Sequence, residues 1–151
     1  MKFICIGRNY IEHAKELNNE APSEPVIFFK PDTALLVPRQ PFFYPEFSKD
    51  IHYECEILVR INRLGKNIQK KFAHRYYEEI GLGIDFTARD LQNDLKAKGL
   101  PWEKAKGFDG SAVVGSFVAL DSLKNKENIE FQLLKNGTMV QHGFSKDMIF
   151  D

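Results

Sequence analysis

Residues 50–59 read Asp-Ile-His-Tyr-Glu-Cys-Glu-Ile-Leu-Val, and this stretch decides the fold. Apolar side chains fall at every second position, which predicts a β-strand. Because side chains alternate between the two faces of a strand, Glu54 and Glu56 project from the same face, about 6–7 Å apart at their α-carbons. Two adjacent carboxylates repel each other, and a hard divalent cation such as Mg²⁺ would neutralise the repulsion. The alternative is a solvated polar face on an amphipathic strand.

Another acidic residue of interest is Asp85, near the end of an apolar run over residues 80–86 that predicts a second strand. A carboxylate between apolar neighbours is expected to be partly buried, and buried carboxylates are usually paired with a cation or bound to a metal. A helix is predicted over residues 88–98, with Arg89 and Gln92 near its start. The strand end and the helix start therefore bring these two residues close to Asp85.

The rest of the chain predicts more strands and a few short helices. Strands are expected over residues 2–6, 26–29 and 113–120, and a hairpin with Asn136-Gly137 at its turn joins residues 129–133 to 138–140. Helices are expected over residues 10–17 and 71–77, a Thr87 cap precedes the helix over 88–98, and residues 102–110 are expected to form a loop. With no internal repeat or linker, the pattern predicts one β-rich α+β domain.

The composition excludes several classes of partner. Of the 151 residues, 21 are Lys or Arg and 21 are Asp or Glu, so the formal net charge is zero and nothing favours nucleic acid or an anionic membrane. No apolar run approaches the roughly 20 residues of a membrane span, and the start of the chain lacks the layout of a signal peptide. Cys5 and Cys55 lie in apolar segments and are expected to be reduced. We therefore expect a soluble, cytoplasmic protein.

Several motifs, taken together, resemble the fumarylacetoacetate hydrolase family over essentially the whole chain and in the family's order. The similarity is greatest to its small single-domain branch of acylpyruvate hydrolases, oxaloacetate decarboxylases or tautomerases, and 2-hydroxyhepta-2,4-diene-1,7-dioate isomerases. The matching stretches are Ile6-Gly7-Arg8-Asn9-Tyr10 with His13 and Glu16, Phe28-Phe29-Lys30-Pro31, Tyr53-Glu54-Cys55-Glu56, Asp85-Phe86-Thr87-Ala88-Arg89-Asp90-Leu91-Gln92, Lys104-Ala105-Lys106-Gly107-Phe108-Asp109, and the Asn136-Gly137 hairpin followed by Gln141 and Asp147-Met148-Ile149-Phe150.

This resemblance implies a mixed β-sandwich roll with a few short helices, formed by residues 1–151 as one catalytic domain and assembled as a homodimer. It also implies one Mg²⁺ or Mn²⁺ ion held by Glu54, Glu56 and Asp85. Three carboxylate ligands leave about three octahedral positions for water or substrate. The family continues into a Gly-Thr-Pro loop and a closing β-segment that are not found in these 151 residues, so we expect the C-terminal part of the domain to be missing from this chain.

The implied activity is metal-dependent hydrolysis of a C–C bond in a 3-acylpyruvate-like 2-oxo acid, through an enolate that the metal stabilises. Lys106 would add a fixed positive charge near the developing oxyanion. His13 would act as general base for the attacking water and Glu16 would orient it, on a helix within residues 1–20 that works as a lid. Gln92 and Arg8 are the expected substrate-binding residues.

Two other activities use the same site and stay open at this point. Decarboxylation or tautomerisation of oxaloacetate needs the same enolate without an attacking water, and isomerisation of 2-hydroxyhepta-2,4-diene-1,7-dioate needs only proton transfer. A function of another class is a non-catalytic, truncated paralogue that acts by dimerising with an intact partner. The presence of all the implied site residues favours an enzyme.

Overall fold

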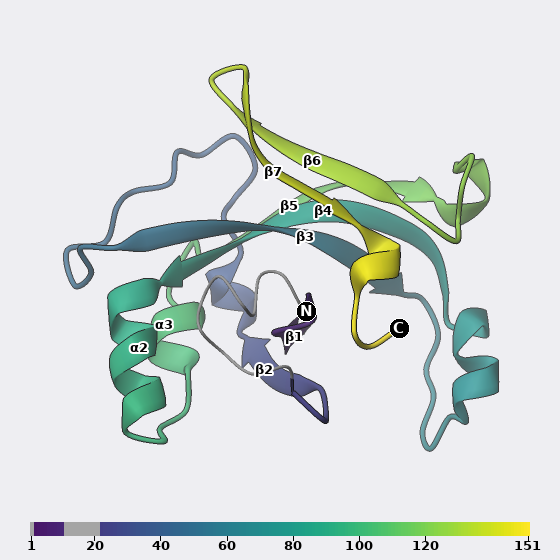
Figure 1. The fold of residues 1–151 in the computed structure, drawn as a ribbon, viewed down its shortest axis with the longest axis horizontal. Coiled ribbons are helices and arrows are strands. Elements are labelled where there is room, and N and C mark those ends of the chain that lie inside the picture. The colour runs from purple at the N-terminus through teal and green to yellow at the C-terminus, as the bar shows by residue number, and fades with distance from the viewer. Residues whose placement is uncertain (1, 11–21) are drawn as a thin grey trace.

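The computed structural model describes residues 2–10 and 22–151, and these form three antiparallel sheets with short helices around them (Figure 1). The central sheet has the order β3-β4-β5, from β3 (Ile51–Ile61), β4 (Tyr77–Ala88) and β5 (Ala112–Ala119). The two smaller sheets pair β1 (Phe3–Gly7) with β2 (Val26–Lys30) and β6 (Glu130–Lys135) with β7 (Thr138–Phe144). The expected β-rich α+β fold is confirmed.

The helices and the β1–β2 sheet lie on one side of the central sheet, and the β6–β7 hairpin lies on the other (Figure 1). The α-helices are α2 (Arg89–Ala97) and α3 (Glu103–Lys106). The described chain also contains four short 3-10 helices: η1 (Asp32–Ala34), η2 (Lys70–Arg75), η3 (Leu120–Ser122) and η4 (Ser145–Asp147). No helix among the described residues has the length and apolar character needed to cross a membrane.

The register of β3 against β4 brings the predicted acidic residues to one face of the sheet. Glu54 pairs with Asp85 and Glu56 with Gly83, and residues directly opposite each other in an antiparallel pair share a face. The position of Gly83 requires glycine, because a Cβ atom there would lie 2.4 Å from the carbonyl oxygen of Val113. Strand alternation therefore produces the arrangement that the sequence predicted for this face.

A small apolar core lies where α2 and α3 pack together at the end of the central sheet. Ala88, Leu95 and Ala105 are buried there, and Leu91 and Trp102 pack against them. Burying a leucine such as Leu95 contributes about 1.5–3 kcal/mol. The helix predicted over 88–98 is confirmed with this apolar stripe, and its first turn is thereby fixed next to the carboxylates of β3 and β4.

Two local predictions are wrong. Thr87 does not cap α2, whose N-cap is Ala88 without a side-chain cap hydrogen bond, because the Thr87 hydroxyl is used inside the site described below. The short helix expected over 71–77 is present as the 3-10 helix η2, with slightly earlier bounds. The loop expected over 102–110 contains α3, which is held by two backbone hydrogen bonds to the carbonyl of Trp102.

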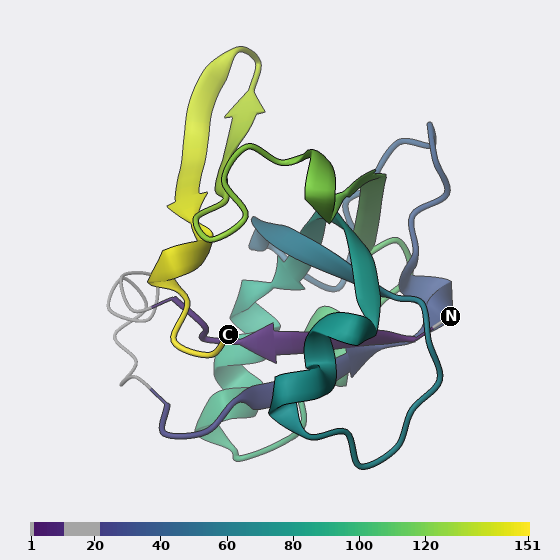
Figure 2. The same ribbon diagram turned by 90° about the vertical axis from the view of Figure 1, so that its right-hand side faces the viewer.

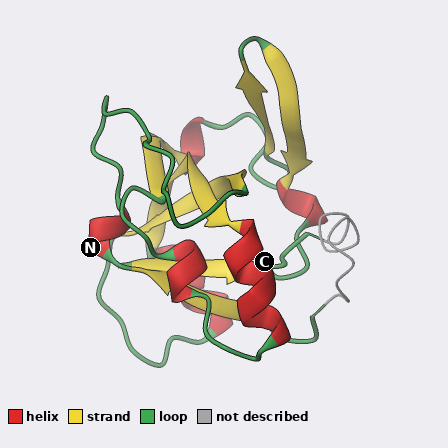
Figure 3. Ribbon diagram, turned by 90° about the vertical axis from the view of Figure 1, so that its left-hand side faces the viewer, coloured by secondary structure: helices red, strands yellow, loops and turns green. Residues whose placement is uncertain are grey.

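The β6–β7 hairpin projects from the body of the molecule (Figures 2 and 3). Below the hairpin, the end of the chain returns to the start: the Asn9 side-chain amide donates to the carbonyl oxygen of Phe150 at 3.0 Å and accepts from its N–H at 2.7 Å. The helix predicted over 10–17 lies almost wholly outside the described residues.

Candidate active site

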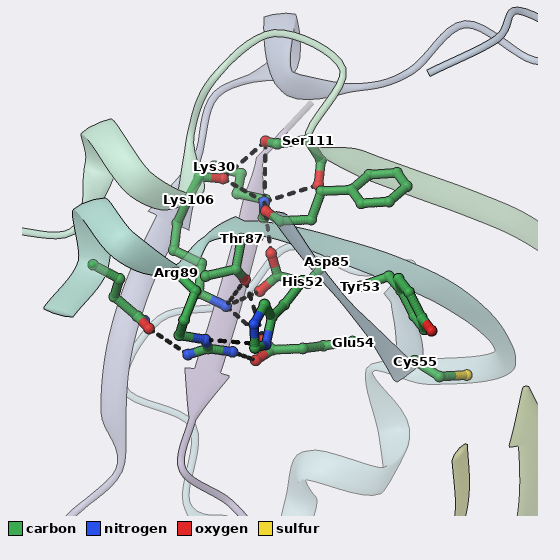
Figure 4. Close-up of polar contacts among 12 residues, drawn as sticks. Lys30, His52, Tyr53, Glu54, Cys55, Asp85, Thr87, Arg89, Lys106 and Ser111 are labelled. Carbon is green, nitrogen blue, oxygen red and sulfur yellow. Dashed lines mark hydrogen bonds and ion pairs between the residues drawn. The ribbon is translucent and has the colours of Figure 1, made fainter. Parts of the chain in front are cut away.

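The centre of the site is the ammonium group of Lys106, which lies between the two paired carboxylates of the central sheet (Figure 4). Lys106 Nζ is 2.6 Å from Glu54 Oε2, 2.8 Å from Asp85 Oδ2 and 2.6 Å from Thr87 Oγ1. An ammonium group has three N–H donors, so each of them has one acceptor here. The side chains of Tyr53 and Cys55 point away from this cluster, as strand alternation requires (Figure 4).

A second buried lysine, Lys30 at the end of β2, approaches the same aspartate from its other oxygen. Lys30 Nζ is 2.8 Å from Asp85 Oδ1. It also donates to Ser111, at 2.9 Å for the carbonyl oxygen and 3.0 Å for the hydroxyl, and to the carbonyl oxygen of Lys106. Lys30 and Lys106 are each only 3% exposed, which for lysine requires such pairing. Lys30 therefore ties the end of α3 and the start of β5 to Asp85.

The two lysines differ in how the site changes their pKa. Burial lowers the pKa of Lys106, but the opposing charges of Asp85 and Glu54 outweigh burial and the net shift is upward. Burial also lowers the pKa of Lys30, and the charge of Asp85 does not compensate for it, so the pKa of Lys30 is below its usual value. Lys106 is thus the more firmly protonated of the two ammonium groups.

Arg89 and Gln92 of α2 complete the cluster on the other side of Glu54. The Arg89 guanidinium donates to Glu54 Oε1 and to Gln92 Oε1, and both α2 side chains are buried. Arg89 Nε also donates to His52 Nδ1 at 3.4 Å. Arg89 therefore orients Glu54, and the packing of α2 fixes its position.

The sequence-predicted residues are brought together to different degrees. Glu54, Asp85, Lys106 and Gln92 meet in the cluster. Glu56 is partly buried on the same face, opposite Gly83. Burial, and to a smaller extent the negative charge of Glu56, raise the pKa of Tyr10 to about 12.

Arg8 lies apart from the cluster. The guanidinium of Arg8 lies over the ring of Trp102, 5.6 Å from its centroid, and it has no hydrogen bond to the cluster among the described residues. His13 and Glu16 fall within 11–21, outside the described residues. Their roles, and the substrate-binding role of Arg8, remain predictions.

Sequence reasoning assigned no role in the site to four residues of this network: Lys30, His52, Thr87 and Ser111. Lys30 carried a usable signal, because a lysine that ends an apolar strand and precedes a proline is placed where its charge has to be compensated. Thr87 and Ser111 carried none, since small hydroxyl residues are common at strand ends and in loops. The ring of His52 accepts a hydrogen bond from Arg89, a residue 37 positions away in the chain.

The donor set is compatible with a divalent cation. Among residues 2–10 and 22–151 no three carboxylate, imidazole or thiol groups are gathered as a ready metal cluster, since Lys106 lies between Glu54 and Asp85. Those carboxylates nevertheless surround a positive charge. The buried Oδ1 of Asp85 accepts no hydrogen bond from a described residue, although Lys30 lies within ion-pair distance. Oxygen donors of this kind are the ligands that Mg²⁺ and Mn²⁺ prefer.

A separate hollow of about 520 Å³ is not lined by the charged residues of the cluster. It is lined by Phe47, Leu91, Glu103, Lys104, Gly107 and Phe108. The charged side chains of the cluster pair with one another. We therefore propose that the chemistry takes place at the cluster and not in this hollow.

Comparison with known proteins places this arrangement in a family. Residues 2–151 match the family model described as "Fumarylacetoacetate (FAA) hydrolase C-terminal". The chain belongs to this family, which confirms the resemblance that its motifs indicated.

The relatives include enzymes with different named activities. The chain is 41% identical to an oxaloacetate decarboxylase of Dictyostelium discoideum, over 99% of its own length and 69% of the relative, and 37% identical to an oxaloacetate tautomerase of Escherichia coli strain K12, over 98% and 68%. A solved fumarylpyruvate hydrolase of Pseudomonas aeruginosa, in complex with Mn²⁺ and pyruvate, superposes with a TM-score of 0.88 at 29% identity, covering 99% of this chain and 66% of that one. The chain thus spans about two thirds of the length of these relatives.

Proposed function

We propose that this member of the fumarylacetoacetate hydrolase family catalyses tautomerisation or decarboxylation of oxaloacetate, using a divalent cation held by Glu54, Glu56 and Asp85. The observation that carries the proposal is the cluster itself: two carboxylates in register on one face of a sheet, with the buried ammonium of Lys106 between them. The names of the curated relatives support oxaloacetate over the acylpyruvate substrate that the sequence favoured.

The chemistry needs a group that stabilises negative charge on the 2-oxo oxygen. In tautomerisation a proton leaves C3 and the 2-oxo oxygen gains one; in decarboxylation the C3–C4 bond breaks, CO₂ leaves and C3 is protonated to give pyruvate. A bound Mg²⁺ or Mn²⁺ would supply Lewis-acid stabilisation of that oxygen. Fixed positive charges in a water-poor site act in the same way and need no reorganisation during the reaction.

Lys106 is suited to be the fixed positive charge. Its pKa is raised, so the ammonium form persists at neutral pH. One of its three N–H donors is bonded to the neutral hydroxyl of Thr87, at 2.6 Å. Redirecting that donor to the 2-oxo oxygen of the substrate leaves both ion pairs, to Glu54 and to Asp85, in place.

Gln92 and Arg89 are suited to orient the substrate and the carboxylate that neighbours it. Gln92 accepts a hydrogen bond from Arg89 through Oε1, and this contact also fixes the orientation of the Gln92 Nε2 amino group. An amide N–H₂ can donate two hydrogen bonds to a substrate carboxylate. His13 and Glu16 are proposed, from the sequence alone, to transfer the C3 proton.

The test is turnover of oxaloacetate by the purified chain, followed by loss of its enol absorbance and by pyruvate formation. The rate is measured with Mg²⁺ or Mn²⁺ and then with excess chelator, against the metal alone, because free divalent ions also promote decarboxylation. We expect protein-dependent turnover that chelator abolishes and that Glu54→Gln lowers at least 100-fold, the scale of losing one preorganised electrostatic contact. Glu79→Gln is the matched control, since the Glu79 carboxylate accepts from the surface residue Arg60 at 2.7 Å and is not part of the cluster. Turnover that survives both chelator and Glu54→Gln would refute the proposal.

Hydrolysis of an acylpyruvate is the second candidate function. It is favoured by the structural match to a fumarylpyruvate hydrolase, and it would use the same charged cluster. Fumarylpyruvate and acetylpyruvate, assayed alongside oxaloacetate under the same conditions, distinguish the two: hydrolysis yields pyruvate and a second carboxylic acid, whereas decarboxylation yields CO₂.

A further inference from the structure

A side chain covers the outer edge of β3 at the point where Glu54 projects. β3 is the outer strand of the central sheet, so no strand of the described part of the chain pairs with the polar backbone groups on its outer edge. The side-chain amide of Gln141 in β7 takes that place. The backbone N–H of Cys55 donates to Gln141 Oε1 at 2.8 Å, and Gln141 Nε2 donates to the carbonyl oxygen of Tyr53 at 2.7 Å.

These two hydrogen bonds flank Glu54 on both sides along the strand. In an antiparallel ladder the N–H and C=O of one residue point to the same neighbour and those of the next residue point the other way. Because the groups of Tyr53 and Cys55 point outward to Gln141, those of Glu54 point inward to its partner Asp85. The backbone N–H of Phe86 bonds to Ser111 in the direction of β5, which is consistent with Asp85 facing β3. The peptide groups around Glu54 are therefore fixed from both edges.

The Gln141 amide also joins the β6–β7 hairpin to the central sheet at this point. Figures 2 and 3 show the hairpin projecting away from the body of the molecule. Both hydrogen bonds are partly buried, which reduces competition from water. The carboxylate of Glu54 is held at its other end by Lys106 and Arg89, so its position depends on contacts from three different elements.

We propose that Gln141 is a positioning residue that sets the place of Glu54, by clasping the outer edge of β3 with both ends of its side-chain amide. The inference deepens the proposed function, on which its metal-ligand part rests. Partners that orient a metal ligand without touching the metal are worth about 10- to 100-fold in metal affinity when they are removed. Gln141 acts in this sense on the backbone of Glu54, not on its carboxylate.

Gln141→Met tests the clasp, because methionine has nearly the same length and cannot replace either hydrogen bond. Gln132→Met is the matched control, with the same change at an exposed position of the neighbouring strand β6. Hydrogen exchange of the backbone amides is measured first and needs no metal. We expect the Cys55 amide to exchange faster in Gln141→Met, while the Glu54 amide, which faces β4, keeps its protection. Unchanged exchange at Cys55 would overturn the clasp.

Mn²⁺ affinity, measured by the loss of the free-ion electron paramagnetic resonance signal, tests the positioning of Glu54. We expect the Kd of Gln141→Met to rise about 10- to 100-fold, with no change in Gln132→Met. Asn9→Ala separates positioning from general loosening, since it removes a similar two-bond amide clasp at Phe150 and should lower the melting temperature without changing the Kd.

The outcomes separate this inference from the proposed function. A faster Cys55 amide with unchanged Mn²⁺ affinity would overturn the positioning role while leaving the metal site intact. Equal losses of affinity in Gln141→Met and Asn9→Ala would also overturn it, because a general loosening would then explain both. A wild-type protein that binds no Mn²⁺ would contradict the proposed function and the metal-ligand role of Glu54, while the Cys55 exchange would still decide whether the clasp exists.

Discussion

Lys106 and Lys30 lie on either side of Asp85, and the two regions around them compensate a buried ammonium group in different ways. The region of Lys106 supplies two carboxylates and a hydroxyl, at 2.6–2.8 Å. The region of Lys30 supplies one carboxylate oxygen, the Ser111 hydroxyl and backbone carbonyl oxygens. The pKa of Lys106 is accordingly raised, although burial opposes the rise, and burial lowers that of Lys30.

This difference separates a group that is available for chemistry from one that holds the structure. A cation among several carboxylates can exchange one neutral partner and remain well compensated. A cation among backbone carbonyls cannot move without leaving those buried groups unpaired, which costs about 1–3 kcal/mol for each group. We therefore propose that Lys106 supplies the fixed positive charge for the chemistry, and that Lys30 fixes the approach of α3 and β5 to the sheet.

The largest effect is expected from Lys106→Met. The substitution leaves Glu54 and Asp85 facing each other without their common cation, and breaking a buried pair in this way costs about 3–5 kcal/mol of unfolding free energy. Urea denaturation at pH 7 measures it. Because a bound divalent cation would neutralise the same carboxylates, millimolar Mn²⁺ should restore much of the loss. A loss that Mn²⁺ does not reduce would contradict a metal site at these carboxylates.

A smaller loss, about 2–3 kcal/mol, is expected from Lys30→Met, because Asp85 keeps its pair with Lys106 while the carbonyl oxygens lose a donor. Here Mn²⁺ should raise the unfolding free energy of Lys30→Met by no more than it raises that of the wild type. If Mn²⁺ rescued Lys30→Met as fully as Lys106→Met, the distinction between the two regions would be wrong.

The pH dependence of stability should distinguish the two lysines by sign. The pKa of Lys30 is lowered in the folded state, so as the pH rises toward the ordinary value of 10.5 the folded chain loses this proton before the unfolded chain does. The unfolded state then binds more protons, and the stability of the wild type relative to Lys30→Met rises with pH in that window. A raised folded-state pKa means that the stabilising charge of Lys106 is fully present below 10.5 and is lost above it. Denaturation at pH 8, 9 and 10 measures the first trend. A wild-type advantage over Lys30→Met that shrinks across this range would contradict the lowered pKa.

The smallest effect is expected from Lys98→Met, the same substitution at the surface. Lys98 Nζ pairs with Asp94 Oδ2 at 2.7 Å, one turn apart on the exposed side of α2. Exposed pairs of this kind contribute about 0.3–0.5 kcal/mol. The change in unfolding free energy should stay within that range and should not depend on Mn²⁺. A loss comparable to that of Lys30→Met would mean that lysine removal, and not burial, explains the series.

The parts of the site that could be predicted from sequence are those that depend on local periodicity. Alternation alone placed Glu54 and Glu56 on one face of a strand, and the start and stop signals of the helix over 88–98 placed Arg89 and Gln92 near its start. Asp85 was predicted to be buried and compensated because charged side chains between apolar neighbours need a partner.

The remaining contacts join residues far apart in the chain, and no local pattern encodes them. Lys30 meets Asp85 and Ser111 only because β2 packs under the central sheet, and Gln141 reaches β3 across 86 residues. The role of Lys106 came from family resemblance and not from its own neighbourhood, where a lysine near a glycine predicts a loop. Thr87 was expected to cap a helix, but its hydroxyl instead accepts a hydrogen bond from the buried ammonium of Lys106.

The central claim, that this cluster with a bound divalent cation stabilises an enolate of a 2-oxo acid, is tested most directly by hydrogen exchange at C3 of pyruvate, the ligand named with the Pseudomonas aeruginosa relative. In D₂O with Mg²⁺, loss of the methyl proton signal is followed by nuclear magnetic resonance. The account predicts exchange that needs both the protein and Mg²⁺, stops with chelator, falls at least 100-fold in Lys106→Met and is unchanged in Lys98→Met. Exchange no faster than with Mg²⁺ alone, or exchange that Lys106→Met leaves intact, would contradict it.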